Sequence, residues 1–396
     1  MTCPHCGYAA KFQDFRPREP LSLLGPVALS RAYYYCGQCG HGLAPFDEAV
    51  GLTPKRLTPG AERITCLAGL LSDSFEEAAE KVLPEMAGLR LSESTSQRTT
   101  ETAGARLGQL LDAGRTLGSP KPWDWNQDAQ GRTCAYVSID AICVAQQAAD
   151  GGPAEGRMPY VAMVYNPIPD LPDTAARVPP PAVRPSGVAA RQQARYLAGL
   201  YPLADLGLLL RKQAAQVGME RAEIWVALTD GGNGLEDFVH ANFGRADLVV
   251  ILDFWHAAEY LADLAKALHP GAEEQSTRLK ESWCHTMKHE GGAAILAVLQ
   301  GLELPQGRPA VAKAYEEAVR YIGNNVHRME YPRYLAEGWQ IGSGAVESAC
   351  KTVVGQRLKL AGMRWREDGT DEVCHMRALF KSEPGQWAAF WRRSVN

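Results

Sequence analysis

The chain has 396 residues, enough for two or three domains, and its composition (46% hydrophobic, 22% charged) is that of a soluble globular protein. The formal net charge of -4 argues weakly against a nucleic-acid partner, although local charge decides such contacts more than the total does. The sequence has neither an apolar run of about 18 residues nor a basic segment followed by an apolar one, so we expect no membrane helix and no secretory signal. We therefore expect a cytoplasmic protein, in a reducing compartment where cysteines bind metal or stay buried.

Two matched Cys-x-x-Cys-Gly segments lie near the start of the chain, separated by 29 residues with strand character; their cysteines are Cys3, Cys6, Cys36 and Cys39. Four thiolates complete the tetrahedral coordination of Zn²⁺, and the trailing glycines let backbone N–H groups turn toward the sulfurs. A closed set of four ligands leaves no open position, so the role is structural. A redox dithiol is the alternative, which two matched pairs disfavour. We predict a zinc ribbon over residues 1–50.

The next segment, residues 60–115, has helical character. Ser74 and Ser92 each precede an acidic first turn, as the N-cap residues of helices do. Two helices joined by a short turn that contains glycine suit a helix-turn-helix, although any small helical domain has the same pattern. We predict a helical DNA-binding region over residues 51–130, which ends in a polar connector at 123–132.

Strands and helices alternate in the rest of the chain. Strands are expected at 136–144, 159–165, 194–200, 224–228 and 248–252, with a hairpin loop at 145–156, an exposed Pro-rich insertion at 166–187 and a helix at 203–217. The segment 256–321 is almost wholly helical, and a further helix carries Glu347. Three neighbouring strands followed by strand–helix alternation predict a multi-domain α/β fold, with a mixed sheet that helices cover.

Three carboxylates are candidates for a metal site. Asp140 lies in the middle of an apolar strand, where a charge is costly unless it is paired or holds a cation. Asp230 ends a strand and is followed by two glycines, and Glu347 follows Gly-Ser-Gly, where Ser343 can cap a helix. An all-oxygen ligand set favours Mg²⁺ or Mn²⁺, and a pair of such ions supports in-line displacement at phosphorus.

Each of these carboxylates also has a purely structural interpretation. A single aspartate at a strand end is usually a turn or cap residue, and Glu347 alone would be a helix-start glutamate that the helix dipole stabilises. Asp253 and His256 are three residues apart, on one helix face, where the histidine can orient a DNA strand or a leaving group. We favour a structural hydrogen bond between them that caps the helix, and Asp253 is the alternative to Asp230 in the metal site.

The C-terminal segment, residues 351–396, is locally basic, with nine Lys or Arg residues against five acidic ones and three interleaved tryptophans. Cations follow phosphates, and flat rings stack on unpaired bases. For the tryptophans (Trp365, Trp387 and Trp391) we favour packing in the core. For Lys351, Arg357, Lys359 and Arg364 we predict contact with DNA.

Several short motifs recur together in this order: Val-Ser-Ile-Asp140, Thr-Asp230-Gly-Gly-Asn-Gly-Leu, Leu-Asp253-Phe-Trp-His256, Gly-Ser-Gly-Ala-Val-Glu347-Ser and Arg357-x-Lys359-x-x-Gly-Met-Arg364-Trp. In this combination, over nearly its whole length, the chain resembles the ISKra-type insertion-sequence transposases of the Mutator-like superfamily. The resemblance implies a ribonuclease-H-like catalytic domain, built from residues 131–255 and 340–396, with Asp140, Asp230 and Glu347 as its DDE triad. The 116 residues between the last two accommodate a helical insertion at 256–339.

The resemblance further implies a DNA transposase that uses Mg²⁺ or Mn²⁺ to cut and join strands at the ends of an insertion sequence. Its expected partner is double-stranded DNA, on which it acts as a homo-oligomer associated with the nucleoid. Two other functions stay open: a catalytically inactive, domesticated transposase that binds DNA, and a nuclease of the ribonuclease H type that cuts without joining.

Overall fold

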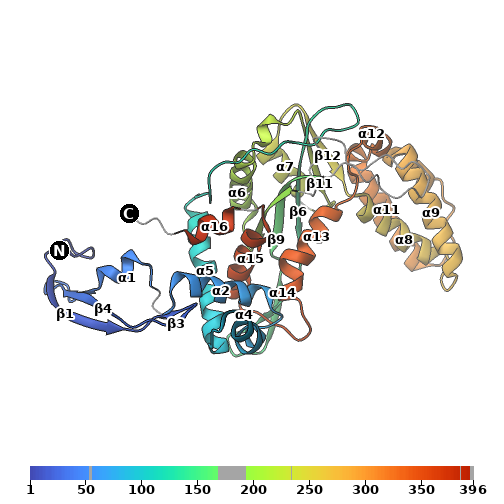
Figure 1. The fold of residues 1–396 in the computed structure, drawn as a ribbon. Helices are drawn as coiled ribbons and strands as arrows, with labels where there is room; N and C mark the ends of the chain where they lie inside the picture. The colour runs from blue at the N-terminus through green and yellow to red at the C-terminus, as the bar shows by residue number, and fades with distance from the viewer. Residues whose placement is uncertain (53–55, 168–192, 233, 384, 393–396) are drawn as a thin grey trace.

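The computed structural model describes residues 1–52, 56–167, 193–232, 234–383 and 385–392. Figure 1 shows an N-terminal arm, a central α/β body and a helical lobe on the side of the body away from the arm. The Pro-rich insertion predicted at 166–187 lies outside the described residues except for its first two positions. Within the described ranges, no helix combines the length and apolarity needed to cross a bilayer.

The arm contains the strands predicted between the two cysteine pairs. β1 (Lys11–Arg18) pairs antiparallel with β4 (Leu29–Tyr35), which also pairs with β5 (Gly42–Leu43). The remaining arm elements are β2 (Leu21–Ser22), β3 (Gly25–Pro26) and α1 (Pro45–Ala49). The buried core of the arm is small, because it consists of Cys3, Ala10, Cys36 and Leu43.

Helices follow the arm, as predicted. They are α2 (Pro59–Leu71), α3 (Phe75–Glu77), the π-helix η1 (Ala78–Val82), α4 (Leu83–Ala87) and α5 (Glu93–Asp112). Both predicted caps are confirmed, because Ser74 Oγ accepts from the Glu77 backbone N–H and Ser92 Oγ accepts from that of Thr95. Residues of α2, α3 and α5 belong to the same buried core as the central sheet, so these helices pack onto the body.

A five-stranded mixed sheet forms the centre of the body, which confirms the predicted α/β class. Its strands are β6 (Cys134–Ala141), β9 (Tyr160–Asn166), β10 (Gln193–Gly199), β11 (Ile224–Thr229) and β12 (Leu248–Leu252). The spatial order is β10-β9-β6-β11-β12. β10, β9 and β6 pair antiparallel, whereas β11 runs parallel to both β6 and β12. The carboxyl ends of β6, β11 and β12 therefore lie at one edge of the sheet.

Two sequence predictions about the body were wrong in detail. The loop predicted at 145–156 is a hairpin of β7 (Val144–Gln147) and β8 (Pro153–Arg157). Its polar residues suggested a loop, but Gln146 is buried and its amide donates to Thr370 Oγ1. The connector predicted as polar at 123–132 buries Trp123 and Trp125, and the Trp125 indole N–H donates to the Gly218 carbonyl at 2.9 Å.

Helices from several parts of the chain surround this sheet. Those before Glu347 are α6 (Leu203–Gln216), the 3-10 turn η2 (Met219–Arg221) and α7 (Leu235–Phe243). The later ones are α13 (Gly344–Ala349), the π-helix η4 (Cys350–Gly355), α14 (Gln356–Leu358), α15 (Glu367–Lys381) and α16 (Gln386–Trp391). α6, α13 and α15 contact the strands directly, and α15 also packs against α5.

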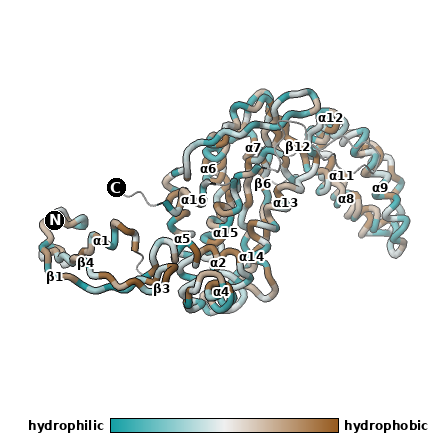
Figure 2. Tube along the Cα trace, viewed as in Figure 1, coloured by the Kyte–Doolittle hydropathy of each residue, from teal (hydrophilic) through white to brown (hydrophobic). Residues whose placement is uncertain are grey.

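The helical lobe confirms the helices predicted over 256–321. It consists of α8 (Phe254–Leu268), α9 (Glu273–Glu290), α10 (Gly292–Gln300), α11 (Pro309–Asn325), the 3-10 turn η3 (Val326–Arg328) and α12 (Tyr331–Ala336). Figure 2 shows hydrophobic and hydrophilic stretches alternating along these helices, as expected when one face of each helix is buried. α8 begins directly after β12, so the lobe starts at the sheet edge where the candidate carboxylates lie.

Candidate functional site

The four N-terminal cysteines form one cluster. Their sulfur atoms all lie within 4.8 Å of one another, with Cys3 and Cys39 separated by 3.8 Å and Cys6 and Cys36 by 3.5 Å. Among the residues that the structure describes, this is the one group of three or more potential ligands gathered so closely. The cluster could hold a structural metal ion such as Zn²⁺.

Local backbone turns build this cluster. Gly7 and Gly40 have φ angles of +77° and +70°, which glycine adopts without strain, and their N–H groups donate to the carbonyls of Cys3 and Cys36 at 2.9 Å. The backbone N–H of Cys39 lowers the pKa of the Cys36 thiol to about 7, whereas burial and the neighbouring thiols raise the pKa values of Cys6 and Cys39. A thiol with this pKa is partly thiolate at neutral pH, which is the form that binds metal.

Asp140 is the penultimate residue of β6, so the prediction that it lies mid-strand was wrong by several residues. Its side chain is half-buried and accepts from the Ala141 backbone N–H at 2.7 Å and from the Cys350 thiol at 3.6 Å. Burial raises the pKa of Asp140, and the neighbouring negative charge of Asp230 raises it further. A carboxylate beside a second negative charge is expected where a bound cation would neutralise both.

Asp230 directly follows β11, as predicted, and begins the glycine-rich loop. Its Oδ1 accepts from the Gly232 backbone N–H at 2.8 Å. The Gly231 N–H donates to the hydroxyl of Tyr321 at 3.0 Å, and a side chain at Gly231 would collide with that ring, 2.4 Å from its nearest atom. The helical lobe therefore holds the loop that carries Asp230.

Arg328 strengthens this connection, and the sequence analysis missed it. It is 3% exposed and donates to Thr229 Oγ1 at 2.9 Å, to the Asp230 carbonyl at 3.3 Å and to Asn325 Oδ1 at 2.6 Å. Glu236 lies 3.6 Å from its Nε and completes the charge balance. No short motif marks Arg328, because its partners Thr229 and Asp230 lie about a hundred residues earlier in the chain.

Glu347 lies in the first turn of α13, and its side chain is exposed. The prediction that Ser343 caps this helix through its side chain was wrong. Ser343 Oγ instead contacts Asp253 Oδ2 at 2.9 Å and Glu347 Oε1 at 2.5 Å, so it joins the glutamate to the end of β12. Cys350, on the next turn, contacts Asp140 and thereby brings the Glu347 helix beside β6.

Asp253 is fully buried, with its carboxylate occupied by hydrogen bonds. Oδ1 accepts from the backbone N–H groups of Trp255 and Ser343, and Oδ2 accepts from Ser343 Oγ and from His256 Nδ1, which is 2.7 Å away. Burial alone would raise the pKa of Asp253, but these hydrogen bonds lower it overall, and Asp253 in turn raises the pKa of His256 to about 9. This geometry fits the structural cap that we favoured, and it leaves Asp230 better placed than Asp253 to bind a cation.

Asp140, Asp230 and Glu347 thus surround one edge of the sheet, but they are less tightly gathered than the cysteines. Their oxygens do not all lie within 4.8 Å of one another. Within the described ranges, none of the three has a Lys, Arg or His partner at salt-bridge distance. An open group of carboxylates that no salt bridge neutralises fits one or more divalent cations, which bind through oxygen ligands. The imidazolium of His256, which lines the hollow beside Asp230, offsets part of their negative charge.

The four basic residues predicted to touch DNA fall into two classes. Lys351, Lys359 and Arg364 are exposed. Arg357 is 1% exposed, its Nε donates to the Gly69 carbonyl at 2.9 Å, and its guanidinium lies 4.4 Å from the centre of the Phe75 ring. The DNA contact predicted for Arg357 is therefore wrong for this structure, in which Arg357 fastens the N-terminal helices to the body. Trp365 is 8% exposed and packs in the core, as favoured.

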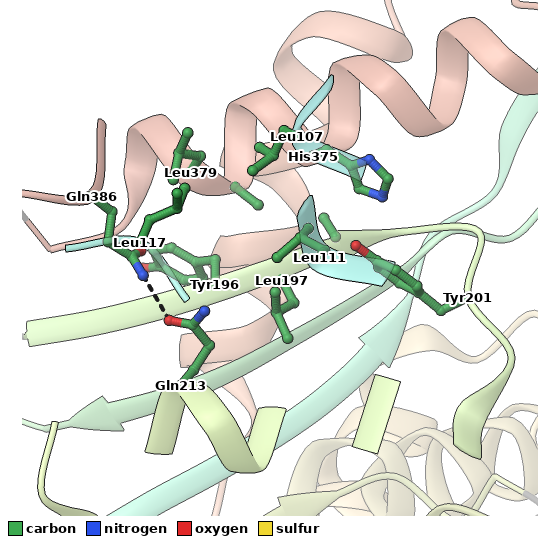
Figure 3. Close-up of a pocket in the computed structure, with 12 residues that line it drawn as sticks. Leu107, Leu111, Leu117, Tyr196, Leu197, Tyr201, Gln213, His375, Leu379 and Gln386 are labelled. Carbon is green, nitrogen blue, oxygen red and sulfur yellow. Dashed lines mark hydrogen bonds between the residues drawn. The ribbon is translucent and has the colours of Figure 1, made fainter. Parts of the chain in front are cut away.

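A small, mostly apolar cavity lies elsewhere in the body, between α5, α15 and β10 (Figure 3). Figure 3 shows leucine side chains around it together with Tyr201 and His375, and a hydrogen bond of 2.8 Å from Gln386 to Gln213 at one side. Its volume of about 20 Å³ is enough for a single water molecule. The cavity therefore does not compete with the carboxylate edge as a substrate site.

No protein-family model matches the chain, and no curated protein matches it either. Side-chain geometry and chemistry therefore carry the argument for function.

Proposed function

We propose that this protein is a DDE transposase of the ISKra type, which uses Asp140, Asp230 and Glu347 to cut and join DNA strands at the ends of an insertion sequence. The observation that supports the proposal is the position of three carboxylates, at the carboxyl ends of β6 and β11 and in the first turn of α13, none of which forms a salt bridge among the described residues.

The arrangement of the sheet supports a ribonuclease-H-like catalytic domain. An antiparallel meander (β6, β9, β10) is followed by two strands parallel to β6, and the candidate carboxylates lie at or just beyond the carboxyl ends of β6 and β11. In open α/β sheets, ligand-binding groups collect outside such strand ends. The lobe inserted between β12 and α13 corresponds to the helical insertion that the family resemblance implies.

Mg²⁺ or Mn²⁺ is the cofactor that this oxygen-only ligand set fits, with Asp140, Asp230 and Glu347 as its ligands. When bound, a pair of such ions supplies Lewis-acid activation of the attacking hydroxyl and stabilisation of the leaving oxygen. The chain itself orients the carboxylates: Cys350 holds Asp140, the Tyr321 and Arg328 side chains hold the Asp230 loop, and Ser343 holds Glu347.

The same site serves both proposed reactions. Water is the nucleophile when a strand is nicked, and a DNA 3′-hydroxyl is the nucleophile when strands are joined, while the displacement at phosphorus is unchanged. The exposed side chains of Lys351 and Lys359, on the elements that continue from α13, supply positive charge for the DNA backbone. Double-stranded DNA is thus the proposed partner, with a homo-oligomer on DNA so that two ends are brought together.

The test is a nicking and strand-transfer assay on a plasmid that carries the DNA flanking the gene. Asp140→Ala, Asp230→Ala and Glu347→Ala should each reduce Mg²⁺-dependent nicking by a factor on the order of 10³ or more, with DNA binding and thermal stability retained. Asp237→Ala is the matched control, since Asp237 is an exposed acid on the helix after the same loop. Full activity in a triad variant would reject that residue.

Other results would identify the competing functions. DNA binding without nicking by the wild-type chain would indicate a domesticated binding protein. Nicking without joining of pre-cut ends would indicate a nuclease.

A further inference from the structure

One tryptophan of the chain is exposed. All nine tryptophans lie within the described residues. Trp255 is 59% exposed, whereas the other eight are buried or half-buried. The three tryptophans of the basic C-terminal segment, where stacking on DNA bases was considered from the sequence, are buried or partly buried against the core. An exposed indole leaves a large apolar surface in water, so its position calls for an explanation.

Trp255 is held in place by its surroundings. Its backbone N–H donates to Asp253 Oδ1 at 3.1 Å, and the preceding Phe254 N–H donates to the Ile341 carbonyl at 2.9 Å. The indole lies against Gly342, because a Cβ at that position would come within 3.0 Å of both Cδ1 and Nε1 of the ring. These contacts join the two motifs Leu-Asp253-Phe-Trp-His256 and Gly-Ser-Gly-Ala-Val-Glu347, so the ring is both exposed and fixed.

The position of the ring relates it to the candidate active site. Trp255 is adjacent in sequence to His256, which hydrogen-bonds Asp253, and it touches the turn that leads through Ser343 to Glu347. His256 lines the hollow beside Asp230, and the Trp255 indole covers the turn at Gly342. The two side chains point in different directions because adjacent residues of a helix do not face each other. The exposed, flat and neutral ring of Trp255 suits stacking on a nucleobase.

We propose that Trp255 is a substrate-positioning residue that stacks on an unpaired base of the DNA end held at the carboxylate edge. This inference rests on the proposed function, because it narrows the substrate from double-stranded DNA to a DNA end with an unpaired base. Stacking is tolerant of sequence because every base presents a π-face, and it complements the phosphate contacts of the exposed Lys351 and Lys359 side chains.

The experiment compares binding of two fluorescein-labelled duplexes by anisotropy at fixed salt, with Ca²⁺ in place of Mg²⁺. One duplex is blunt, and the other carries a short single-stranded oligothymidine end. Trp255→Ala should weaken binding of the second duplex by roughly fivefold to 100-fold, with less than about a twofold effect on the blunt one. Trp255→Phe should lose less than Trp255→Leu, because leucine retains apolar contact with Gly342 but has no π-face.

Fluorescence gives a readout that altered folding cannot imitate. Oligothymidine should quench the tryptophan emission of the wild-type chain, and the Trp255→Phe variant should lack that part of the quenching. Equal losses for the two duplexes, equal affinity of the Phe and Leu variants, or loss of self-association in Trp255→Ala with DNA binding retained would each overturn the proposal. The triad variants separate the two claims: stacking without triad-dependent nicking contradicts the proposed function alone, and triad-dependent nicking without stacking contradicts this inference alone.

Discussion

The cysteine cluster of the arm and the carboxylate edge of the body are both candidate metal centres, but they are built in different ways. Each cysteine pair is shaped by its own turn, with Gly7 and Gly40 completing the two turns, so four sulfurs lie within 4.8 Å. The carboxylates depend instead on buried hydrogen bonds between distant segments, such as Ser343 to Asp253 and Arg328 to Thr229. A closed structural site can thus assemble locally, whereas an open site depends on the whole fold.

Removal of the metal from the cysteine cluster should have the largest effect on structure. The arm buries few side chains of its own, so its fold should depend on Zn²⁺ binding, which contributes about 10–16 kcal/mol in small zinc domains. We expect one Zn²⁺ per chain by atomic absorption. Cys36→Ser or a chelator should abolish protection of residues 1–50 from hydrogen exchange, while the melting temperature of the body stays unchanged. An arm that remains protected without metal would show that the turns suffice.

Substitution of Arg328 should show how far the carboxylate edge depends on hydrogen bonds from the helical lobe. Arg328→Met removes its hydrogen bonds to Thr229, Asn325 and the Asp230 carbonyl, and leaves Glu236 with His327 as its nearest basic partner. We expect a loss of about 3–5 kcal/mol in the free energy of unfolding, measured with urea, because several hydrogen bonds from a buried charged donor are lost. Nicking activity should fall even at temperatures where the variant is folded. Arg320→Met, on the exposed face of α11, is the control, and equal effects of the two substitutions would contradict this role.

Loss of the carboxylate at Asp253 should lower the stability of the folded protein, whereas loss of the charge at Asp140 should raise it. Asp253→Ala leaves His256 and the backbone N–H groups of Trp255 and Ser343 without their acceptor and should cost about 3 kcal/mol of stability. Asp140→Asn relieves repulsion from Asp230 and should stabilise the metal-free protein by up to about 1 kcal/mol. Thermal melts in EDTA measure both. A stabilising Asp253→Ala substitution would contradict the structural role of Asp253, and a strongly destabilising Asp140→Asn substitution would contradict the role of Asp140 in cation binding.

A smaller effect is expected from a carboxylate that belongs to neither centre. Burial, together with the negative charge of the nearby Glu101, raises the pKa of Glu372 from 4.5 to about 7. The folded state therefore holds this proton more tightly than the unfolded state, so stability falls as pH rises from about 4.5 to 7. Glu372→Gln should stabilise the protein by about 1 kcal/mol at pH 8, after allowance for solvent screening, and by almost nothing at pH 4.5. Urea titrations at the two pH values check this, and a pH-independent difference would contradict it.

The sequence predicted best what depends on neighbouring residues. Cysteine spacing located the arm cluster, Ser74 and Ser92 marked two helix starts, and β-branched runs located the five strands of the sheet. The sequence predicted poorly those features that depend on contacts with residues far away in the chain. Arg357 has the same chemistry as the exposed Lys359, and only the packing of Phe75 and Trp365 around it shows that it is buried.

The same limit explains the errors at the candidate site. Ser343 precedes a helix and has the residue type of an N-cap, but Asp253, 90 residues earlier, draws its hydroxyl away from the helix. Arg328 and Tyr321 have no motif that marks them, although both hold the Asp230 loop. Burial and long-range hydrogen bonding therefore determine which of several suitable residues occupy a site.

Binding of Mn²⁺, followed by electron paramagnetic resonance on protein with its cysteine cluster loaded with Zn²⁺, tests the central claim most directly. The wild-type chain should bind Mn²⁺ at a site from which Mg²⁺ displaces it, and Asp140→Asn and Asp230→Asn should each abolish that signal while Asp237→Asn leaves it intact. Mn²⁺ binding that is unchanged in both triad variants would contradict a shared cation site at this edge of the sheet.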